Sequence, residues 1–350
     1  MPIGAAIVAR APGKLVALGE YAVLDGAPAL VLSVDRYATA TIERDPGPGC
    51  RLTTLMPDPE ERSFGRGRPS GVRLVDLVTG VDLVTGSSPA FGALPAWRGT
   101  LDSVPFFAGG FKLGLGSSAA ALCAWAAAFR RFAAGAGVDA PAPTVAELIE
   151  LHRAFQGGRG SGVDVAASHS GGAIVYRLSR SGEPQIGSVR LPNSVGFAGI
   201  FAGRSASTPA LVAHYRGWGR GRPDQAAAML ASLTRVAEVG CAAACGDDGV
   251  ALVEAIAEYG RALQNLGSAI GAEIVTAEHR RIGEHARRYG VAYKVSGAGG
   301  GDLGLACALD LEALAAFGHA MAAEGFRVID VRPAERGLFI DSGVDAGEQS

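Results

Sequence analysis

The hydrophobic pattern of the first 45 residues is typical of short β-strands separated by turns. Residues 37–42 alternate polar and apolar side chains, with Thr39 and Thr41 between Ala38 and Ile42, and this is the period of a half-buried strand. Proline and glycine interrupt the earlier apolar runs, so turns are expected there. Further strands are predicted over 98–107, 172–178 and 196–202.

Residues 45–71 carry many prolines, glycines and charged side chains, which predicts a loop. A five-residue duplication, DLVTG, lies within 76–86 and is too short to indicate a repeat architecture. Neither segment indicates a function by itself.

Helical patterns dominate the rest of the chain. An alanine-rich run predicts a helix that opens at GLGSSAA and continues to about residue 134. Thr144 is placed to cap a second helix, VAELIELHRAFQ, which stops at Gly157. Longer helices are predicted over 224–245, 248–270, 272–289 and 311–324. Strand-like runs lie between and after the last two, so we expect an α+β protein with domains 1–190 and 191–350.

Composition and charge narrow the classes of partner. The chain has 350 residues, 48% of them hydrophobic and 19% charged, which is typical of a globular protein with a real core. Its net charge of −2 comes without a basic block, which argues against nucleic-acid binding. The N-terminus lacks the layout of a signal peptide, and the run 119–129 is too short to span a bilayer. We therefore expect a cytoplasmic protein without a membrane partner.

Neither cysteines nor histidines show the spacing of a metal site. Five cysteines are scattered, and the pair Cys241 and Cys245 is expected to form small core residues on one helix face. Most of the six histidines are expected at the surface or in helix packing. His169 and His214 are the exceptions, because they lie near candidate site segments.

The sequence KLGLGSSA combines features of a phosphate-binding helix N-terminus. Gly114 and Gly116 allow the backbone to approach a ligand, and Ser117 and Ser118 begin a helix whose free N–H groups and dipole suit an anion. A serine hydroxyl here can cap the helix, bind a phosphate oxygen or ligate Mg²⁺. Lys112 adds a positive charge. The alternative is an ordinary helix cap with this lysine in solvent.

Three other glycine-rich places carry polar side chains. APGK presents Lys14 at a turn, where it is either solvated or directed at a ligand. GRGSGVD places Asp164 among small residues, as a substrate contact or a helix cap. SGAGGGD has more glycines than a hairpin needs, which favours a backbone nest for an anion. Dinucleotide-like glycine spacings at Gly114 and Gly299 lack the acidic residue or the helix that this motif requires.

Taken in order, APGK, GLGSSAA, SGVD and SGAGGGD resemble the motif series of the GHMP small-molecule kinases, from Arg10 to about Ile340. The resemblance implies a two-domain α+β fold, ribosomal-S5-like at the N-terminus and ferredoxin-like at the C-terminus. It also implies a transferase that uses ATP and Mg²⁺, with the nucleotide phosphates at the helix N-terminus.

The resemblance assigns site residues by position. It makes Lys14, Lys112 and Asp164 catalytic, with Ser118 as the Mg²⁺ ligand. The nucleotide would contact Gly114, Leu115, Gly116, Ser117, Ser118 and Ala119. The other substrate would contact Lys14, Ser161, Gly162, Ser205, Ser207, Thr208, Gly297, Ala298, Gly299, Gly300 and Gly301. Arg159 and Arg204 are further candidate cations.

One departure concerns the metal. Mevalonate kinases of this family usually place a glutamate about three helical turns before the aspartate, whereas this chain reads LHRAFQ there. The second Mg²⁺ ligand is therefore not identified by the resemblance, and the departure counts against mevalonate as the acceptor.

Four segments, GEYAVLDG, FKLGLGSS, TLDSVPFF and GRSASTPALV, look most like the branch of the family that phosphorylates phosphomevalonate. This predicts a small phosphorylated substrate and a monomer or homodimer in the mevalonate pathway of isoprenoid biosynthesis. The alternatives are a kinase acting on an alcohol, such as mevalonate, a mevalonate phosphate or a sugar, and a non-catalytic relative that only binds a ligand.

Overall fold

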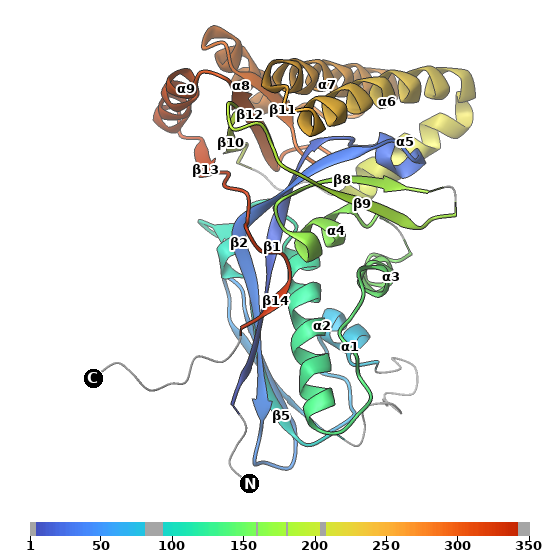
Figure 1. The fold of residues 1–350 in the computed structure, drawn as a ribbon, viewed down its shortest axis with the longest axis vertical. Helices are drawn as coiled ribbons and strands as arrows, with labels where there is room; N and C mark the ends of the chain where they lie inside the picture. The colour runs from blue at the N-terminus through green and yellow to red at the C-terminus, as the bar shows by residue number, and fades with distance from the viewer. Residues whose placement is uncertain (1–4, 81–93, 159, 180, 204–207, 342–350) are drawn as a thin grey trace.

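The computed structural model describes residues 5–80, 94–158, 160–179, 181–203 and 208–341. The molecule is elongated, with a large sheet and its helices at one end and a smaller sheet under a layer of helices at the other (Figure 1). Strands and helices are mixed throughout, which confirms the expected α+β class.

The large sheet has eight strands. Its main path runs β14-β1-β2-β5-β3-β4, with β8 pairing the first part of β2 and β9 pairing β8. The pairings are antiparallel except that of β3 with β5. The strand bounds are β1 Ile7–Leu18, β2 Ala29–Arg44, β3 Cys50–Leu55, β4 Glu60–Phe64, β5 Trp97–Asp102, β8 Ala173–Leu178, β9 Pro184–Val189 and β14 Phe339–Ile340.

The prediction of short strands broken by turns was wrong for β1 and β2, which are long and continuous. Pro12 and Gly13 do not turn the chain but mark a register shift within β1. A Cβ at Gly13 would lie 2.7 Å from the Leu115 carbonyl oxygen and 2.6 Å from the Phe106 ring. The glycine is therefore explained by close approach of a neighbouring segment rather than by a turn.

The predicted loop at 45–71 was also wrong in part, because it contains β3 and β4. Along β3, Cys50 and Leu52 are buried while Arg51 is exposed, so the alternation is real but only six residues long. Because prolines and glycines flank β3, its short alternating pattern was not recognised as a strand in the sequence. The strand expected over 98–107 ends at Asp102, and a 3₁₀ turn (η2, Val104–Phe106) follows.

The helices beside the large sheet follow the sequence pattern more closely. The predicted alanine-rich helix is α2, and it packs against β1 and β2 with Trp125 and Phe129 buried. Thr144 and Glu147 form a reciprocal capping box at the start of α3. The bounds are α1 Arg73–Val78, α2 Ser117–Gly135, α3 Val145–Phe155 and α4 Val163–Ser170, with η1 at Ala22–Asp25 and a small hairpin of β6 Phe107–Ala108 and β7 Phe111–Lys112.

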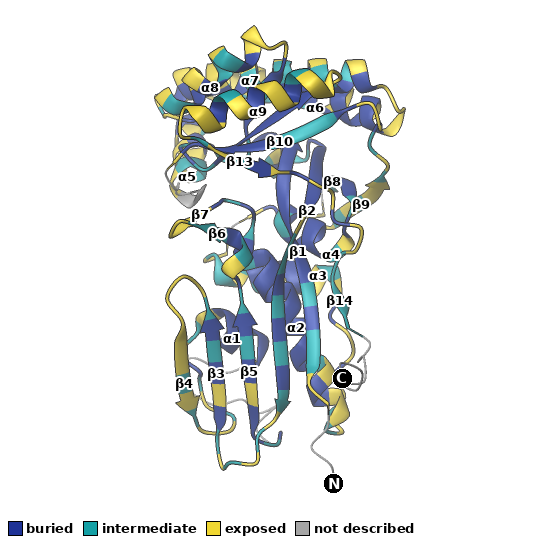
Figure 2. Ribbon diagram, turned by 90° about the vertical axis from the view of Figure 1, so that its left-hand side faces the viewer, coloured by how far each residue is buried: buried dark blue, intermediate teal, exposed yellow. Residues whose placement is uncertain are grey.

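The second sheet is antiparallel, in the order β11-β12-β10-β13. Its strand order and its βαββαβ connection are those of a ferredoxin-like layer. Helices α8 and α9 pack on the face that carries Ala306, whereas α7 belongs to the core cluster that contains Leu305 and Cys307 of the opposite face; the outer faces of the helices are exposed (Figure 2). The bounds are β10 Gly196–Phe201, α5 Thr208–Gly221, α6 Pro223–Cys245, α7 Gly249–Ile270, α8 Ala277–Arg288, β11 Ala292–Val295, β12 Leu303–Ala308, α9 Leu311–Ala323 and β13 Arg327–Asp330.

The end of the described chain returns to the first sheet. β14 pairs with β1, and the Leu338 amide donates to the His169 carbonyl oxygen at 3.0 Å. The division into 1–190 and 191–350 stays a prediction, and this returning segment connects the two regions.

Two features of α6 bear on the sequence analysis, and one of them corrects it. By length and composition alone α6 could cross a membrane, but buried core helices meet the same criterion, and its residues Leu233, Val236 and Ala237 lie in the hydrophobic core. Cys241 is a buried core residue as predicted, whereas Cys245 is exposed. The cysteine pair therefore does not share one buried face.

Candidate active site

Lys14 lies inside β1 and points away from solvent. Its side chain is nearly buried, with 7% of the residue exposed, and its Nζ lies 3.3 Å from Asp164 Oδ1. Its backbone N–H donates to the Leu115 carbonyl oxygen at 2.8 Å, which joins β1 to the loop before α2. The solvated-turn interpretation of Lys14 was wrong, because the lysine is held against a carboxylate.

Asp164 comes from the first turn of α4. The N-cap of this helix is Gly162, at φ +87°, and no side chain caps the helix. A Cβ on this glycine would lie 2.7 Å from Ile149 Cγ2, so α3 and α4 pack closely there. The aspartate does not cap α4, and its carboxylate faces Lys14 instead.

Residues 114–118, here called the serine loop, enter α2 through two left-handed glycines. Gly114 and Gly116 have φ of +75° and +76°. A Cβ on the second would lie 2.9 Å from Lys14 Cγ, so a glycine there lets the lysine pass. This glycine is also the N-cap of α2 and has no side chain to satisfy the first N–H groups. Those groups are therefore suited to an anion.

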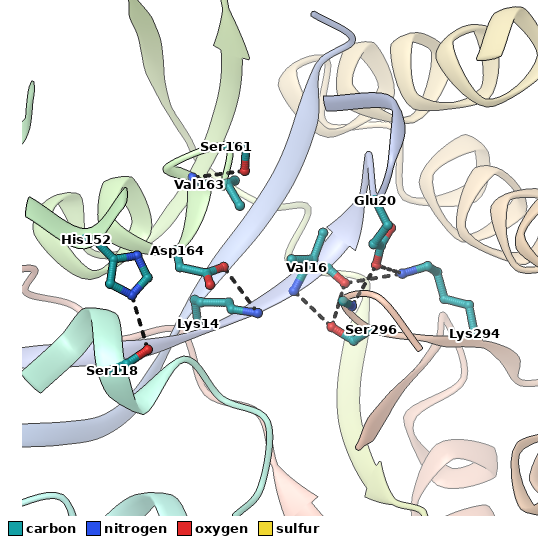
Figure 3. A network of polar contacts seen from close by, with 11 residues as sticks. Lys14, Val16, Glu20, Ser118, His152, Ser161, Val163, Asp164, Lys294 and Ser296 are labelled. Atoms are coloured by element: carbon teal, nitrogen blue, oxygen red, sulfur yellow. Dashed lines mark hydrogen bonds and ion pairs between the residues drawn. The ribbon is translucent and has the colours of Figure 1, made fainter. Parts of the chain in front are cut away.

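Ser117 and Ser118 are helical residues rather than the cap. The Ser118 hydroxyl lies 3.1 Å from His152 Nε2, as Figure 3 shows. This histidine projects from α3 and is only 3% exposed. Burial lowers the pKa of His152, and the charges of Lys112 and Lys14 lower it further against the opposing effect of Asp164.

His152 is the main site residue that sequence reasoning missed, because it was placed with the surface and packing histidines. A signal was present. The residue lies four positions after Leu148, on the apolar face of α3, and a polar side chain on a buried face needs a partner.

A cavity of about 160 Å³ lies beside Lys14 and Asp164 and is lined from both regions of the chain, but the serine loop does not contribute to its lining. Part of the cavity wall is apolar and is formed by Val16, Leu24 and Val163. Of the predicted residues, Lys14, Ser161, Gly162, Asp164, Gly297 and Ala298 line it, together with His152. The structure therefore brings together side chains that are up to 284 positions apart, as from Lys14 to Ala298.

Residues 296–301, here called the late glycine loop, are tied to the start of the chain. Ser296 Oγ donates to the Val16 carbonyl oxygen and accepts from the Val16 N–H, both at 3.0 Å. Tyr21 Oη donates to the Ala298 carbonyl oxygen at 2.6 Å. The Gly297 N–H donates to Glu20 Oε1 at 3.2 Å.

A buried ion pair supports this loop. Lys294 Nζ donates to Glu20 Oε1, and both side chains are almost fully buried. Burial lowers the pKa of Lys294, and the neighbouring carboxylate opposes this. The Tyr259 hydroxyl donates to the Glu20 carbonyl oxygen at 2.7 Å and fixes the backbone beside the pair.

The predicted anion nest is partly used within the protein. The Gly300 N–H donates to the Ile274 carbonyl oxygen at 2.8 Å, and a Cβ on Gly299 would lie 2.3 Å from that same oxygen. The N–H groups of Gly297 and Gly300, both expected to face an anion, are therefore already hydrogen-bonded within the protein. The role of Gly299, Gly300 and Gly301 in substrate binding stays a prediction.

The remaining predicted residues contribute less to this description. Lys112 is exposed, on β7 of the hairpin that leads to the serine loop. Thr208 begins α5, but its side chain is not described. Arg159, Arg204, Ser205 and Ser207 lie outside the described residues.

The donors near the serine loop fit Mg²⁺ held together with nucleotide phosphates. Among the described residues, no group of three or more histidine, cysteine, aspartate or glutamate side chains forms a metal cage. Mg²⁺ commonly takes only one or two protein ligands, mostly carboxylates, beside substrate phosphates and water. The Ser118 hydroxyl and the Asp164 carboxylate are oxygen donors of this kind, and assigning Ser118 to the metal stays a prediction.

Both the sequence and the structure match known proteins. Residues 104–172 match the family model described as the GHMP kinases N terminal domain. A phosphomevalonate kinase from Streptomyces sp. (strain CL190) is 30% identical over 346 residues, covering 88% of this chain and 91% of that protein.

Solved structures share the fold. The Lin0012 protein from Listeria innocua matches with a TM-score of 0.79 at 23% identity, over 97% of this chain and 100% of that one. The phosphomevalonate kinase of Streptococcus pneumoniae, in complex with phosphomevalonate and AMPPNP, matches with a TM-score of 0.72 at 19% identity. The match covers 93% of this chain and 99% of that one. The mevalonate kinase of L. major, in complex with R-mevalonate, matches with a TM-score of 0.68 at 19% identity, over 93% of this chain and 95% of that one. Together with the sequence relative, these matches show that the chain is a phosphotransferase that belongs to the GHMP kinase family.

Proposed function

We propose that this enzyme transfers the γ-phosphoryl group of ATP to the phosphate of 5-phosphomevalonate, forming 5-diphosphomevalonate in the mevalonate route to isoprenoids. The observation that carries the proposal is the Lys14–Asp164 pair, 3.3 Å apart on the wall of a cavity beside the serine loop. The phosphomevalonate kinase relative supports the choice of acceptor. We place the enzyme in the cytoplasm as a monomer or homodimer, acting on small molecules.

The serine loop provides the nucleotide end of the site. Its left-handed glycines leave the first N–H groups of α2 for the β- and γ-phosphates. Lys112, exposed on the adjoining hairpin, adds positive charge there. Mg²⁺, held by the Ser118 hydroxyl and the phosphates, supplies charge neutralisation when bound.

Lys14 provides the transfer end. Phosphoryl transfer depends mainly on positioning and on stabilising the charge of the moving group. A nearly buried ammonium is effective for this, because its charge acts through a medium of low dielectric constant. Asp164 fixes the position of this ammonium and compensates its charge before substrates bind.

The acceptor decides what else Asp164 must do. A phosphate monoester has a second pKa of about 6 and is largely dianionic at neutral pH. One of its oxygens forms the new P–O bond while the bond between the γ-phosphorus and the ADP oxygen breaks, so no proton has to be removed. An alcohol acceptor would instead require a base.

The cavity fits an acceptor with a hydrocarbon middle and an anionic end. Val16, Leu24 and Val163 contribute an apolar wall, while Lys14 provides a cation at one side.

A panel of acceptors tests the proposal through ADP release with Mg–ATP. We expect turnover with 5-phosphomevalonate and little or none with mevalonate, galactose or homoserine. Turnover of mevalonate without turnover of 5-phosphomevalonate would show that the acceptor is an alcohol. The non-catalytic alternative requires that no acceptor is turned over and that Mg–ATP does not bind.

A further inference from the structure

The Ser118–His152 contact joins two helices that meet at the serine loop. Ser118 is the second residue of α2, and His152 lies in the last turn of α3, 34 positions away. The imidazole stacks on Phe155, with ring centroids 6.1 Å apart and planes at 20°. Burial and this stacking hold the ring in one orientation, with Nε2 directed at the Ser118 hydroxyl.

Packing alone does not explain a histidine at this position. The face of α3 that carries it is apolar, with Leu148 and Ile149 buried beside it. A polar ring in such a place costs free energy unless it is hydrogen-bonded. The partner that Nε2 finds is the hydroxyl next to the nucleotide-binding N–H groups.

The direction of this hydrogen bond decides where the serine oxygen points its lone pairs. A hydroxyl has one proton and two lone pairs. When the proton goes to His152 Nε2, both lone pairs remain for a cation. When Nε2 carries a proton and donates it, one lone pair is used and the hydroxyl proton points elsewhere. The contact itself, 3.1 Å between the two atoms with the histidine only 3% exposed, fits a hydroxyl that donates to a ring nitrogen.

We propose that His152 is a positioning residue whose Nε2 accepts the Ser118 hydroxyl proton and thereby directs the serine oxygen at Mg²⁺–ATP. The proposal rests on the nucleotide half of the proposed function and not on the identity of the acceptor. In this proposal His152 acts through Ser118, although its side chain also lines the cavity assigned to the acceptor.

The tautomer is the first test. In a protein with ¹⁵N-labelled histidine, we expect His152 to be neutral at pH 7.5, with the proton on Nδ1 and a bare Nε2. Ser118→Ala should shift the Nε2 resonance, because its donor is removed. A proton on Nε2 in the wild-type protein would overturn the proposal.

The second test measures ATP binding by calorimetry, with excess Mg²⁺ and with EDTA, in the absence of any acceptor. Loss of a residue that orients a metal ligand typically weakens metal affinity about 10–100-fold. We therefore expect His152→Leu to weaken Mg–ATP binding at least about tenfold while metal-free ATP binding changes less than about twofold. His152→Gln, whose amide oxygen can accept the same proton, should restore most of the affinity.

Two further proteins provide controls. His285→Gln should behave as wild type, because His285 on α8 pairs at 2.9 Å with Glu324, the C-cap residue of α9. In a Ser118→Ala background, His152→Leu should add little, since its target is gone. Additive losses, or equal losses with and without Mg²⁺, would show that the histidine only packs.

The outcomes are distinguishable from failure of the proposed function. A wild-type protein that binds Mg–ATP but ignores 5-phosphomevalonate would refute the acceptor and leave the His152 proposal standing. A wild-type protein that does not bind Mg–ATP would refute both. If His152→Leu does not fold, the tautomer and the Ser118→Ala protein still decide the question.

Discussion

The serine loop and the late glycine loop have similar compositions but use their glycines differently. In the serine loop, Gly116 allows Lys14 to pass beside the backbone and leaves the first N–H groups of α2 without a capping side chain. In the late glycine loop, the N–H groups of Gly297 and Gly300 are bonded to Glu20 and to Ile274. The first loop therefore keeps polar groups for a ligand, whereas the second uses the Gly297 N–H to join the two regions and the Gly300 N–H to hold its own region together.

Because the two loops use their polar groups differently, mutations in them should have different effects on activity and on stability. Changes around the serine loop should lower activity more than stability, because its polar groups are arranged for a ligand. Changes around the late glycine loop should lower stability first, because the contacts in and beside it join β1 and the residues after it to β11 and to the segment between α7 and α8. The predictions below test this separation.

Lys14→Met should have the largest effect on activity. Removing a single preorganised group that stabilises transition-state charge costs about 10²–10³-fold in kcat, and we expect the upper end because the ammonium is nearly buried. The thermal midpoint should change little, since the Asp164 side chain remains 30% exposed and hydrated. Steady-state kinetics and a thermal melt check both. A loss of folding comparable to the loss of activity would contradict the separation.

Lys294→Met should have the largest effect on stability. It leaves the Glu20 carboxylate buried without its cation, and breaking a buried pair in this way typically costs about 3–5 kcal/mol of unfolding free energy. Urea unfolding measures it. Arg235→Met is the matched control, because Arg235 and Glu258 form an exposed pair 3.7 Å apart, and it should unfold like wild type. Equal stability of the two variants would show that the buried pair is not needed.

Gly116→Ala should reduce kcat/KM by about a hundredfold, since small misplacements of reacting groups cost that much. The added Cβ would lie 2.9 Å from Lys14 Cγ, at a backbone φ of +76° that alanine rarely adopts. Gly135→Ala is the control, because no atom lies within 4 Å of its added Cβ at the end of α2. If both variants keep full activity, the close approach to Lys14 has no functional consequence.

The smallest expected effect is the pH dependence of the unfolding free energy, which is tested on the serine-loop side of the comparison. Burial lowers the pKa of both His152 and His169 in the folded protein. The unfolded chain therefore binds more protons than the folded one as the pH falls below about 6.5, and the unfolding free energy should decrease there. Each histidine contributes at most about 1.4 kcal/mol per pH unit.

Urea unfolding between pH 5 and 8 measures this slope. His169→Gln should make it shallower without affecting Mg–ATP binding, because this histidine ends α4 on the side that contacts the segment before β14. A protein that becomes more stable on acidification would contradict the prediction.

The sequence was sufficient for the parts of the fold that depend on local pattern. The alanine-rich α2, the cap of α3 at Thr144 and the long helices of the second layer were all predicted. The placement of Lys14 and Asp164 in one site followed from the order of the motifs, and the structure puts the two side chains in contact.

Other parts depend on contacts between distant segments. Pro12 and Gly13 indicated a turn, but they mark a register shift within one strand, and Phe106 and Leu115 pack closely against Gly13. β14 has only two residues, and its role appears only through pairing with β1. No local pattern of a single sequence contains this information.

The same limit applies within the site. The Glu20–Lys294 pair joins residues 274 positions apart, and the His152–Ser118 contact joins two helices. Each residue is unremarkable in its own segment. Only the packing of α3 on α2, and the approach of Lys294 on β11 to Glu20 just after β1, shows which polar side chains meet.

The central claim is that the acceptor atom is a phosphate oxygen. The most direct measurement is ³¹P NMR of the product formed from Mg–ATP and 5-phosphomevalonate by the wild-type enzyme. The account predicts one ADP per product and two mutually coupled phosphorus doublets from a new diphosphate. A product with two separate phosphate monoesters would show transfer to a hydroxyl and would contradict it, as would the absence of any product.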